Sequence, residues 1–241
     1  MKNPTQPAPQ LLGGNLYSGK EELLATTLLR KYNTHICALI AKNIPLNNKP
    51  ICMLDFGAGY GILADIMIQH GVVTCIEIDP DLASHLRQKH HVSESLAEIS
   101  NNSIHFIYSS NVLEHIKDDE TTLKQLFGKL KKEGLLCLYL PAFDIIWSKM
   151  DERVGHHRRY SSQLIQKKLH DAGFQVKHWQ YVDCLGFFVT LIFKLLGSKN
   201  GEASTRSLQI YDKFLFPIST KLDHLFKNRI GKNIFIVAQK N

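Results

Sequence analysis

The sequence predicts an α/β fold with a mainly parallel sheet covered by helices on both faces. Between residues 51 and 140, short apolar runs alternate with amphipathic helical patterns, which is typical of parallel strands joined by crossover helices. The run at 72–78 is rich in β-branched residues, as strands often are. Gly134 and Pro141 stand at element boundaries, where chain breakers are common.

The individual elements follow from the period of the apolar residues. The predicted strands are 51–56, 72–78, 104–110, 135–140, 175–183 and 233–239. The predicted helices are 61–71, 80–89, 118–132 and 162–174, and most of 184–230. Gly71 is expected to close the first of these helices. Proline in its first turn favours the second, and Ser161 or Ser162 caps the fourth.

Length and composition fit one large domain with an insertion. The chain has 241 residues, of which 44% are hydrophobic and 21% charged, an ordinary globular composition. We expect a flexible N-terminal tail at 1–15, because its first ten residues include three prolines. The main domain is predicted at 16–183 and 232–241, with a helical cap at 184–231 between its two parts.

Cysteine usage and hydropathy predict a cytoplasmic protein. The five cysteines form no CxxC pair and have mostly apolar neighbours, so buried free thiols in a reducing compartment are expected. The N-terminus shows no basic-then-apolar signal pattern. The most apolar segment, 184–197, has 14 residues and contains Lys194, whereas a membrane-spanning helix needs about 20.

Positive charge is concentrated in the C-terminal part of the chain. Residues 151–241 carry 15 Lys/Arg and 7 Asp/Glu, a net of +8, against +7 for the whole chain. This asymmetry favours an anionic partner such as phosphate, nucleic acid or lipid headgroups. The alternative is a solvated face with surplus lysine.

A glycine-rich turn and a later carboxylate indicate an adenosine-type ligand. The first strand runs into DFGAGYG at 55–61, which places glycines at 57, 59 and 61. The spacing lacks the third glycine of the dinucleotide fingerprint, and no Lys-Ser/Thr follows as in a P-loop. Glu77 ends the next strand about 20 residues later, where a carboxylate can accept hydrogen bonds from ribose hydroxyls. An ordinary tight turn and a surface acid are the structural alternatives.

Four segments resemble, in order and spacing, the motifs of class I S-adenosylmethionine-dependent methyltransferases. They are LDFGAGYG, IEIDPD, IYSSNVLEHI and LKKEGLLCLYLPAF, within residues 50–145. Beyond them, DERVGHHRRYS, IYDKFLFPISTKLDHLF and GKNIFIVAQK resemble a bacterial branch associated with lipid or glycan substrates. The resemblance implies a Rossmann-like seven-stranded sheet with an antiparallel last strand, helices on both faces, a helical insertion before that strand, and S-adenosyl-L-methionine as cofactor.

The resemblance also implies roles for individual residues. The methionine end of the cofactor would lie against Asp55, Gly57, Ala58 and Gly59, with Gly61 completing the loop. Glu77 would bind the ribose, Ile78 would pack on the adenine, Ser95 would lie at its edge, and Asn111 would line the floor between cofactor and acceptor. This chain has Glu94 and Ser95 where relatives often carry an aspartate, and His105 where they often carry another.

Methyl transfer to a hydroxyl needs a base more than transfer to a thiol or an amine does. Three histidines are candidates: His115, His156 and His157. Some ubiquinone-pathway relatives carry an E-x-x-E-H motif that holds a divalent metal. Here Asn111 takes its first position and leaves only Glu114 and His115, a poor hard-metal site, so no metal is expected.

The run DERVGHHRRYS at 151–161 is expected on the acceptor side of the cofactor. Arg158, Arg159 and Tyr160 would bind and orient an anionic acceptor, because the arginine fork matches phosphate and carboxylate. The structural alternative is a loop whose Asp151 and Glu152 pair with Arg158 and Arg159 to hold its shape.

The sequence thus predicts methyl transfer, most naturally to an oxygen of a small or lipid/glycan-linked anionic acceptor. The cap at 184–231 combines Phe and Leu with Lys and Arg, so it covers the acceptor or contacts the inner face of a membrane as a peripheral surface. One alternative is a non-catalytic cofactor-binding or membrane-associated scaffold. The other is an RNA methyltransferase, which the absence of an N-P-P-Y-type tetrad at SSNVLEH and of nucleic-acid modules disfavours.

Overall fold

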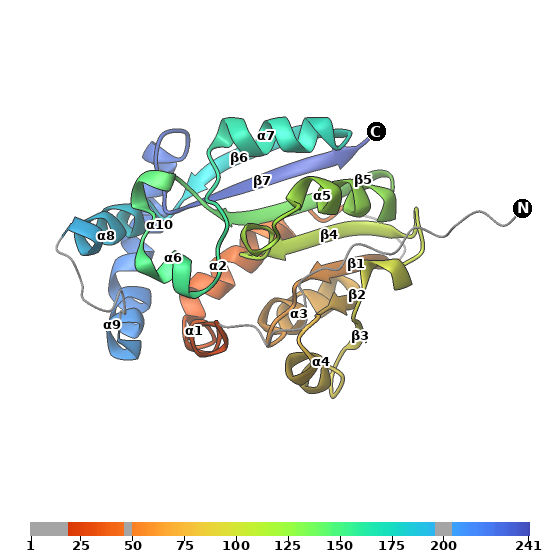
Figure 1. Cartoon of the computed structure of the whole chain (residues 1–241), viewed down its shortest axis with the longest axis horizontal. Coiled ribbons are helices and arrows are strands. Elements are labelled where there is room, and N and C mark those ends of the chain that lie inside the picture. The colour runs from red at the N-terminus through yellow and green to blue at the C-terminus, as the bar shows by residue number, and fades with distance from the viewer. Residues whose placement is uncertain (1–18, 46–49, 196–203) are drawn as a thin grey trace, which may run out of the picture.

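A seven-stranded sheet in the order β3-β2-β1-β4-β5-β7-β6 forms the centre of the computed structural model (Figure 1). The structure describes residues 19–45, 50–195 and 204–241, and the expected tail at 1–15 lies outside these ranges. The strands are β1 (Ile51–Phe56), β2 (Gly71–Ile76), β3 (His91–Ser93), β4 (Ile104–Ser110), β5 (Leu130–Pro141), β6 (Phe174–Val182) and β7 (Asn233–Lys240).

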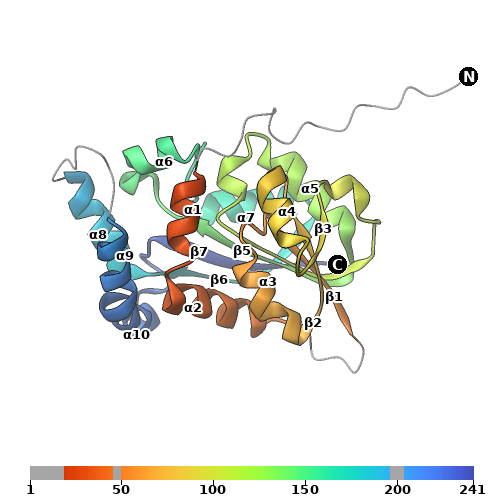
Figure 2. The same cartoon turned by 90° about the horizontal axis from the view of Figure 1, so that it is seen from below.

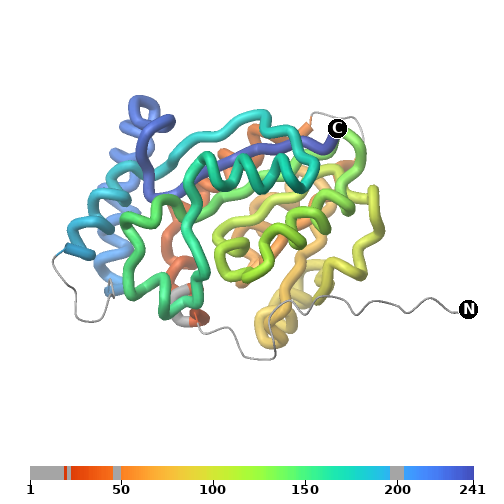
Figure 3. Tube along the Cα trace, turned by 45° about the horizontal axis from the view of Figure 1, so that its top comes forward, coloured from red at the N-terminus to blue at the C-terminus, as the bar shows by residue number. Residues whose placement is uncertain are grey.

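The last strand is the antiparallel one. β7 pairs antiparallel with both β5 and β6, whereas the strand pairs from β3 to β5 are parallel. Figure 3 shows the C-terminal strand lying between segments that come much earlier in the chain. The predicted Rossmann-like topology is confirmed.

Helices cover both faces of the sheet. They are α1 (Lys20–Thr26), α2 (Arg30–Ala41), α3 (Ile62–Met67), α4 (Pro80–Leu86), α5 (Asp119–Lys129), α6 (Lys149–Arg153), α7 (Ser162–Asp171), α8 (Cys184–Leu195), α9 (Thr205–Ile210) and α10 (Phe216–Phe226). α2 and α3 cover one face and α5 and α7 the other, as Figure 2 shows.

Two apolar clusters, one on each face of the sheet, form the core. Along β1, Met53 belongs to the cluster under α2 and α3, and Leu54 belongs to the cluster under α5 and α7. Neighbouring strand residues point to opposite faces, so both must be apolar when both faces are covered. This explains why β1 is apolar at consecutive positions.

The observed elements differ from the predicted ones most clearly at β3, β5 and Gly71. β3 has only three residues, too few for a periodic pattern. β5 begins at Leu130, inside the predicted helix, and its register against β4 shifts between Ile104 and Phe106. Gly71 begins β2 instead of ending a helix; a Cβ there would lie 2.3 Å from the carbonyl oxygen of Ile51, so close backbone approach, not helix termination, requires the glycine.

The segment after β6 forms a helical layer at the end of the sheet where β4, β5 and β6 end (Figure 1). It comprises α8, α9, α10 and a π-helical stretch at Tyr211–Leu215. Phe187 and Phe216 are buried by this packing. Within the described residues, none of the helices has both the length and the apolar character needed to cross a membrane.

Candidate functional site

The turn after β1 needs its glycines. Gly57, Gly59 and Gly61 have φ of +79°, +57° and +77°, a region that side chains disfavour. The amides of Gly57 and Ala58 both donate to the carbonyl of Ile76, at 2.9 and 3.0 Å. A Cβ on Gly57 would lie 2.4 Å from Cγ2 of Val112. The turn is therefore packed between the ends of β2 and β4, as expected of a ligand-binding loop.

Glu77 lies directly against this turn. Its Oε2 accepts from the amide of Gly59 at 2.8 Å, and its Oε1 accepts from the amide of Asp79 at 2.9 Å. Burial raises the pKa of the carboxyl, although the two hydrogen bonds act in the opposite direction and lower it. The structure thus brings together the two features from which an adenosine-type ligand is predicted.

The other predicted cofactor residues are placed differently from one another. Asp55 is only 1% exposed, and neither of its carboxylate oxygens has a hydrogen-bond partner in the described part of the chain. Ile78 is 37% exposed and available for packing. Ser95 caps a short 3-10 turn by accepting from the amide of Ala97, while the neighbouring Glu94 pairs with Arg87. The cofactor role of these residues stays a prediction.

Helix α1 lies over the glycine turn. A Cβ on Gly59 would lie 3.2 Å from Cδ2 of Leu23, and the ammonium of Lys20 binds Asp79 at 3.0 Å and Asp81 at 2.7 Å. The sequence analysis missed this element. Its seven residues, KEELLAT, are too few to show a clear apolar period.

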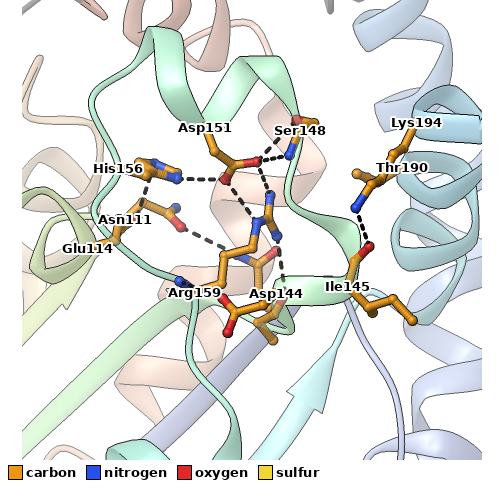
Figure 4. A network of polar contacts seen from close by, with 12 residues as sticks. Asn111, Glu114, Asp144, Ile145, Ser148, Asp151, His156, Arg159, Thr190 and Lys194 are labelled. Atoms are coloured by element: carbon orange, nitrogen blue, oxygen red, sulfur yellow. Dashed lines mark hydrogen bonds and ion pairs between the residues drawn. The ribbon is translucent and has the colours of Figure 1, made fainter. Parts of the chain in front are cut away.

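Asn111 joins the ends of three strands. Its amide donates to the carbonyl of Tyr139, at 2.8 Å, with φ at +53°. Its side-chain amide donates to Ser110 at 3.2 Å and its Oδ1 accepts from Asn233 at 3.3 Å. Asn111 therefore connects β4, β5 and β7. Figure 4 shows it close to His156 of the loop 151–161.

Asp151 organises the loop 151–161. It is 1% exposed, caps α6 by accepting from the Ser148 amide, and binds Nε and an Nη of Arg159 at 2.8 and 3.1 Å. It also lies 2.7 Å from Nδ1 of His156. Burial alone would raise the pKa of Asp151, but the His156 hydrogen bond and the Arg159 charge outweigh it and hold the pKa well below its ordinary value. The carboxylate is therefore ionised, so Nδ1 of His156 donates to it.

The three residues expected to bind an anionic acceptor are engaged inside the protein. Arg159 also donates to the carbonyl of Ala142 and is 6% exposed. Arg158 donates to two carbonyls, Ile116 and Lys117, and binds Asp119 at 2.8 Å. The buried Tyr160 donates to the same Asp119 at 2.9 Å.

This placement favours the structural alternative for the run, with one pair as expected and one different. Asp151 pairs with Arg159, whereas Arg158 pairs with Asp119 instead of Glu152. In this arrangement their polar groups hold the loop against the start of α5 and the end of β5, and a role of these side chains in orienting the acceptor stays a prediction. A charged run in sequence cannot show whether its partners are ligands or its own neighbours.

The three candidate histidines differ in environment. His157 has an exposed side chain. His115 and His156 face each other, with ring centroids 4.6 Å apart at 74°. Burial lowers the pKa of His115 to about 4, helped by the neighbouring His156. Nε2 of His156 lies 3.8 Å from Oε1 of Glu114. Figure 4 shows these two residues beside each other.

Glu114, which the sequence analysis treated only as a weak metal ligand, is the most unusual of these groups. It has no exposed surface, and burial raises its pKa to about 8. Its signal in the sequence was the NVLEHI motif alone. His156, which lies opposite Glu114, comes from a loop that follows β5. Only the fold brings Glu114 and His156 together.

Comparison with known proteins agrees with this geometry. A family model described as "Methyltransferase domain" matches residues 28–178. None of the curated proteins matches the sequence. A SAM-dependent methyltransferase from Thermotoga maritima superimposes with a TM-score of 0.62 at 14% identity, covering 93% of this chain and 98% of that one.

Two further structures share the fold. The Haemonchus contortus phosphoethanolamine N-methyltransferase 2, solved with S-adenosyl-L-methionine, has a TM-score of 0.61 at 15% identity, covering 92% of this chain and 57% of that chain. The cyclopropane synthase MmaA2 from Mycobacterium tuberculosis has a TM-score of 0.58 at 14% identity, covering 86% and 84%. Such distant likeness shows the fold, whereas the family match spans more than half of the sequence. The chain therefore belongs to the methyltransferase domain family and is a class I S-adenosylmethionine-dependent methyltransferase.

Proposed function

We propose that the protein transfers the methyl group of S-adenosyl-L-methionine to an oxygen of an anionic acceptor, either a small molecule or one linked to a lipid or glycan. The observation that carries this proposal is the group formed by Glu114, His115 and His156 beside Asn111. Methyl transfer is an in-line displacement in which the cofactor supplies the reactive methyl, so the chain's own residues must align the acceptor and activate its oxygen.

Basic side chains near a hydroxyl acceptor can activate it in two ways. They can take the proton of the hydroxyl, or they can hold a cation that lowers the pKa of the hydroxyl. Asp151 fixes the His156 ring so that Nε2 keeps its lone pair and faces Glu114. A neutral amine acceptor has a lone pair of its own and needs no such group, so this arrangement supports an oxygen acceptor.

The surface of the helical layer supports a lipid-linked acceptor and contact with the inner face of a membrane. Several large apolar side chains are exposed there: Phe188, Ile192, Phe193, Leu195, Ile210, Phe214, Leu215, Ile218, Leu225 and Phe226. Exposed basic side chains of the same layer accompany them: Lys194, Arg206, Lys213, Lys221 and Lys227. Apolar and cationic groups together match the interface of an anionic membrane.

Two other functions are possible for this fold, and the methyl-transfer assay described below distinguishes them. A scaffold that binds the cofactor without turnover keeps the glycine turn and Glu77. An RNA methyltransferase would use the positive charge, but the apolar side chains between the basic ones fit a lipid surface better than a phosphate backbone.

The test is transfer of a tritiated methyl group from S-adenosylmethionine into a cell lysate, followed by separation into lipid, water-soluble and RNA fractions. We expect alkali-stable label in the lipid or anionic small-molecule fraction. Label mainly in RNA would overturn the acceptor assignment. Absence of label, with S-adenosylhomocysteine still raising the melting temperature, would support the scaffold.

A further inference from the structure

We propose that Glu114, His115 and His156 form a binding site for one borderline divalent cation, of the class of Zn²⁺, Fe²⁺ and Co²⁺. Each residue offers one ligand atom, and these atoms all lie within 4.8 Å of one another. The residues come from two segments: the 3-10 turn Leu113–His115 after β4, and the stretch after α6 that contains His156. The site goes beyond the methyl-transfer assignment and does not depend on it for binding.

The spacing suits a metal after small side-chain rotations. Metal–ligand bonds of about 2.0–2.2 Å place neighbouring ligand atoms roughly 3–3.5 Å apart. Nε2 of His156 and Oε1 of Glu114 are already 3.8 Å apart. That separation is too long for a hydrogen bond, and a bound cation would close it by less than about an ångström.

Glu114 supplies the independent observation that points to a ligand. Its side chain is fully buried, and neither carboxylate oxygen has a hydrogen-bond partner in the described part of the chain. A buried carboxylate without a partner is costly. A cation between Glu114 and the two imidazoles would satisfy it.

His156 is oriented as metal-binding histidines usually are. Nδ1 donates to Asp151 at 2.7 Å, which leaves the lone pair of Nε2 directed at Glu114. A carboxylate that holds the far nitrogen of a ligating histidine fixes the tautomer and raises the basicity of the ligand. Asp151 is itself held by Arg159 and Ser148, so the support is rigid.

Two imidazoles and one carboxylate select the class of metal. Mg²⁺ and Ca²⁺ prefer oxygen ligands, whereas two nitrogens and one carboxylate suit Zn²⁺ and Fe²⁺. Three protein ligands leave at least one coordination position open. The sequence-based expectation of no metal considered only the residues near Glu114 in the chain and had no way to include His156.

Any role of the cation in activating the acceptor rests on the proposed function, but its binding is testable alone. Untagged protein, stripped with a chelator, would be titrated with Co²⁺ and followed by visible absorption, then with Zn²⁺ as competitor. We expect one equivalent of Co²⁺, displaced by Zn²⁺, without cofactor or acceptor.

Matched variants assign the site. Glu114→Gln and His156→Ala should each weaken Co²⁺ binding at least about tenfold, and Asp151→Asn about 10–100-fold through the His156 ring. His157→Ala, at the exposed neighbour, should bind as wild type. Thermal melting with S-adenosylhomocysteine checks that each variant is folded.

Two results would overturn the site. One is that wild-type protein does not bind Co²⁺ stoichiometrically. The other is that folded Glu114→Gln and His156→Ala bind Co²⁺ as tightly as wild type. A protein that transfers methyl groups but binds no cation would refute this inference and leave the proposed function intact. Cation binding without methyl transfer to any oxygen acceptor would refute the proposed function alone.

Discussion

Nδ1 of His156 lies 2.7 Å from Oδ1 of Asp151, and the same carboxylate binds the buried guanidinium of Arg159. One carboxylate therefore neutralises an arginine and orients a histidine. The loop 151–161 combines a structural ion pair with a presented imidazole, so its two interpretations from sequence are complementary.

We expect Asp151→Asn to lower the free energy of unfolding by about 3–5 kcal/mol, because the substitution leaves the Arg159 charge buried without its ionic partner. Urea denaturation measures the change. Glu152→Gln, at the exposed neighbour, is the control and should change stability by less than about 0.5 kcal/mol. Equal stability of Asp151→Asn and wild type would show that Arg159 finds another partner.

Two glycines allow a matched test of the cofactor turn. Gly57→Ala should destabilise the protein by at least about 1–2 kcal/mol, because φ is +79° and the new methyl would meet Val112 at 2.4 Å. Gly128→Ala, in α5 with its nearest neighbour at 3.8 Å, should instead stabilise by about 0.5–1 kcal/mol. Similar effects of the two changes in thermal melting would contradict this description of the turn.

The strands and the cofactor turn could be predicted because local pattern determines them. Mainly apolar runs at 51–56 and 104–110 give β1 and β4 with their observed bounds, and the glycines mark a turn whose φ values need them. β3 has three residues and owes its existence to pairing with β2. No local pattern encodes that pairing.

The acceptor side could be predicted only in part, because long-range contacts decide it. The sequence singles out His156, but not that Asp151 orients it or that Glu114 lies opposite. Likewise it singles out Arg158 and Arg159, but their partners, Asp119 and Asp151, follow from how the loop folds over α5. Charged residues show their roles only once their neighbours are known.

Glu77→Gln should remove most of the stabilisation that S-adenosylhomocysteine gives. At 100-fold over its Kd, a ligand stabilises by about 2.7 kcal/mol. The amide keeps the size of the side chain but loses the charge and one acceptor, which the turn and a ribose both need. Thermal melting with and without ligand separates loss of binding from loss of stability. Glu133→Gln, near the start of β5, is the control. An unchanged ligand shift in Glu77→Gln would refute the ribose assignment.

Asp55 makes a prediction about pH. Burial raises the pKa of its carboxyl from 3.8 to about 8. Between about pH 4 and pH 8, the folded protein keeps this proton while the unfolded chain releases it, so stability from this group falls as pH rises. Asp55→Asn has no proton to lose. Measured without cofactor, the variant should gain stability relative to wild type by up to about 1.4 kcal/mol for each pH unit in this range.

The measurement is urea denaturation of both proteins at several pH values, because their difference cancels the other titrating groups. Asp171→Asn is the control: Asp171 is exposed and Lys167 lowers its pKa, so this variant should show no gain as pH rises. A pH-independent difference between Asp55→Asn and wild type would mean that Asp55 is ionised in the folded protein. The residue directly before the glycine turn would then carry a buried negative charge.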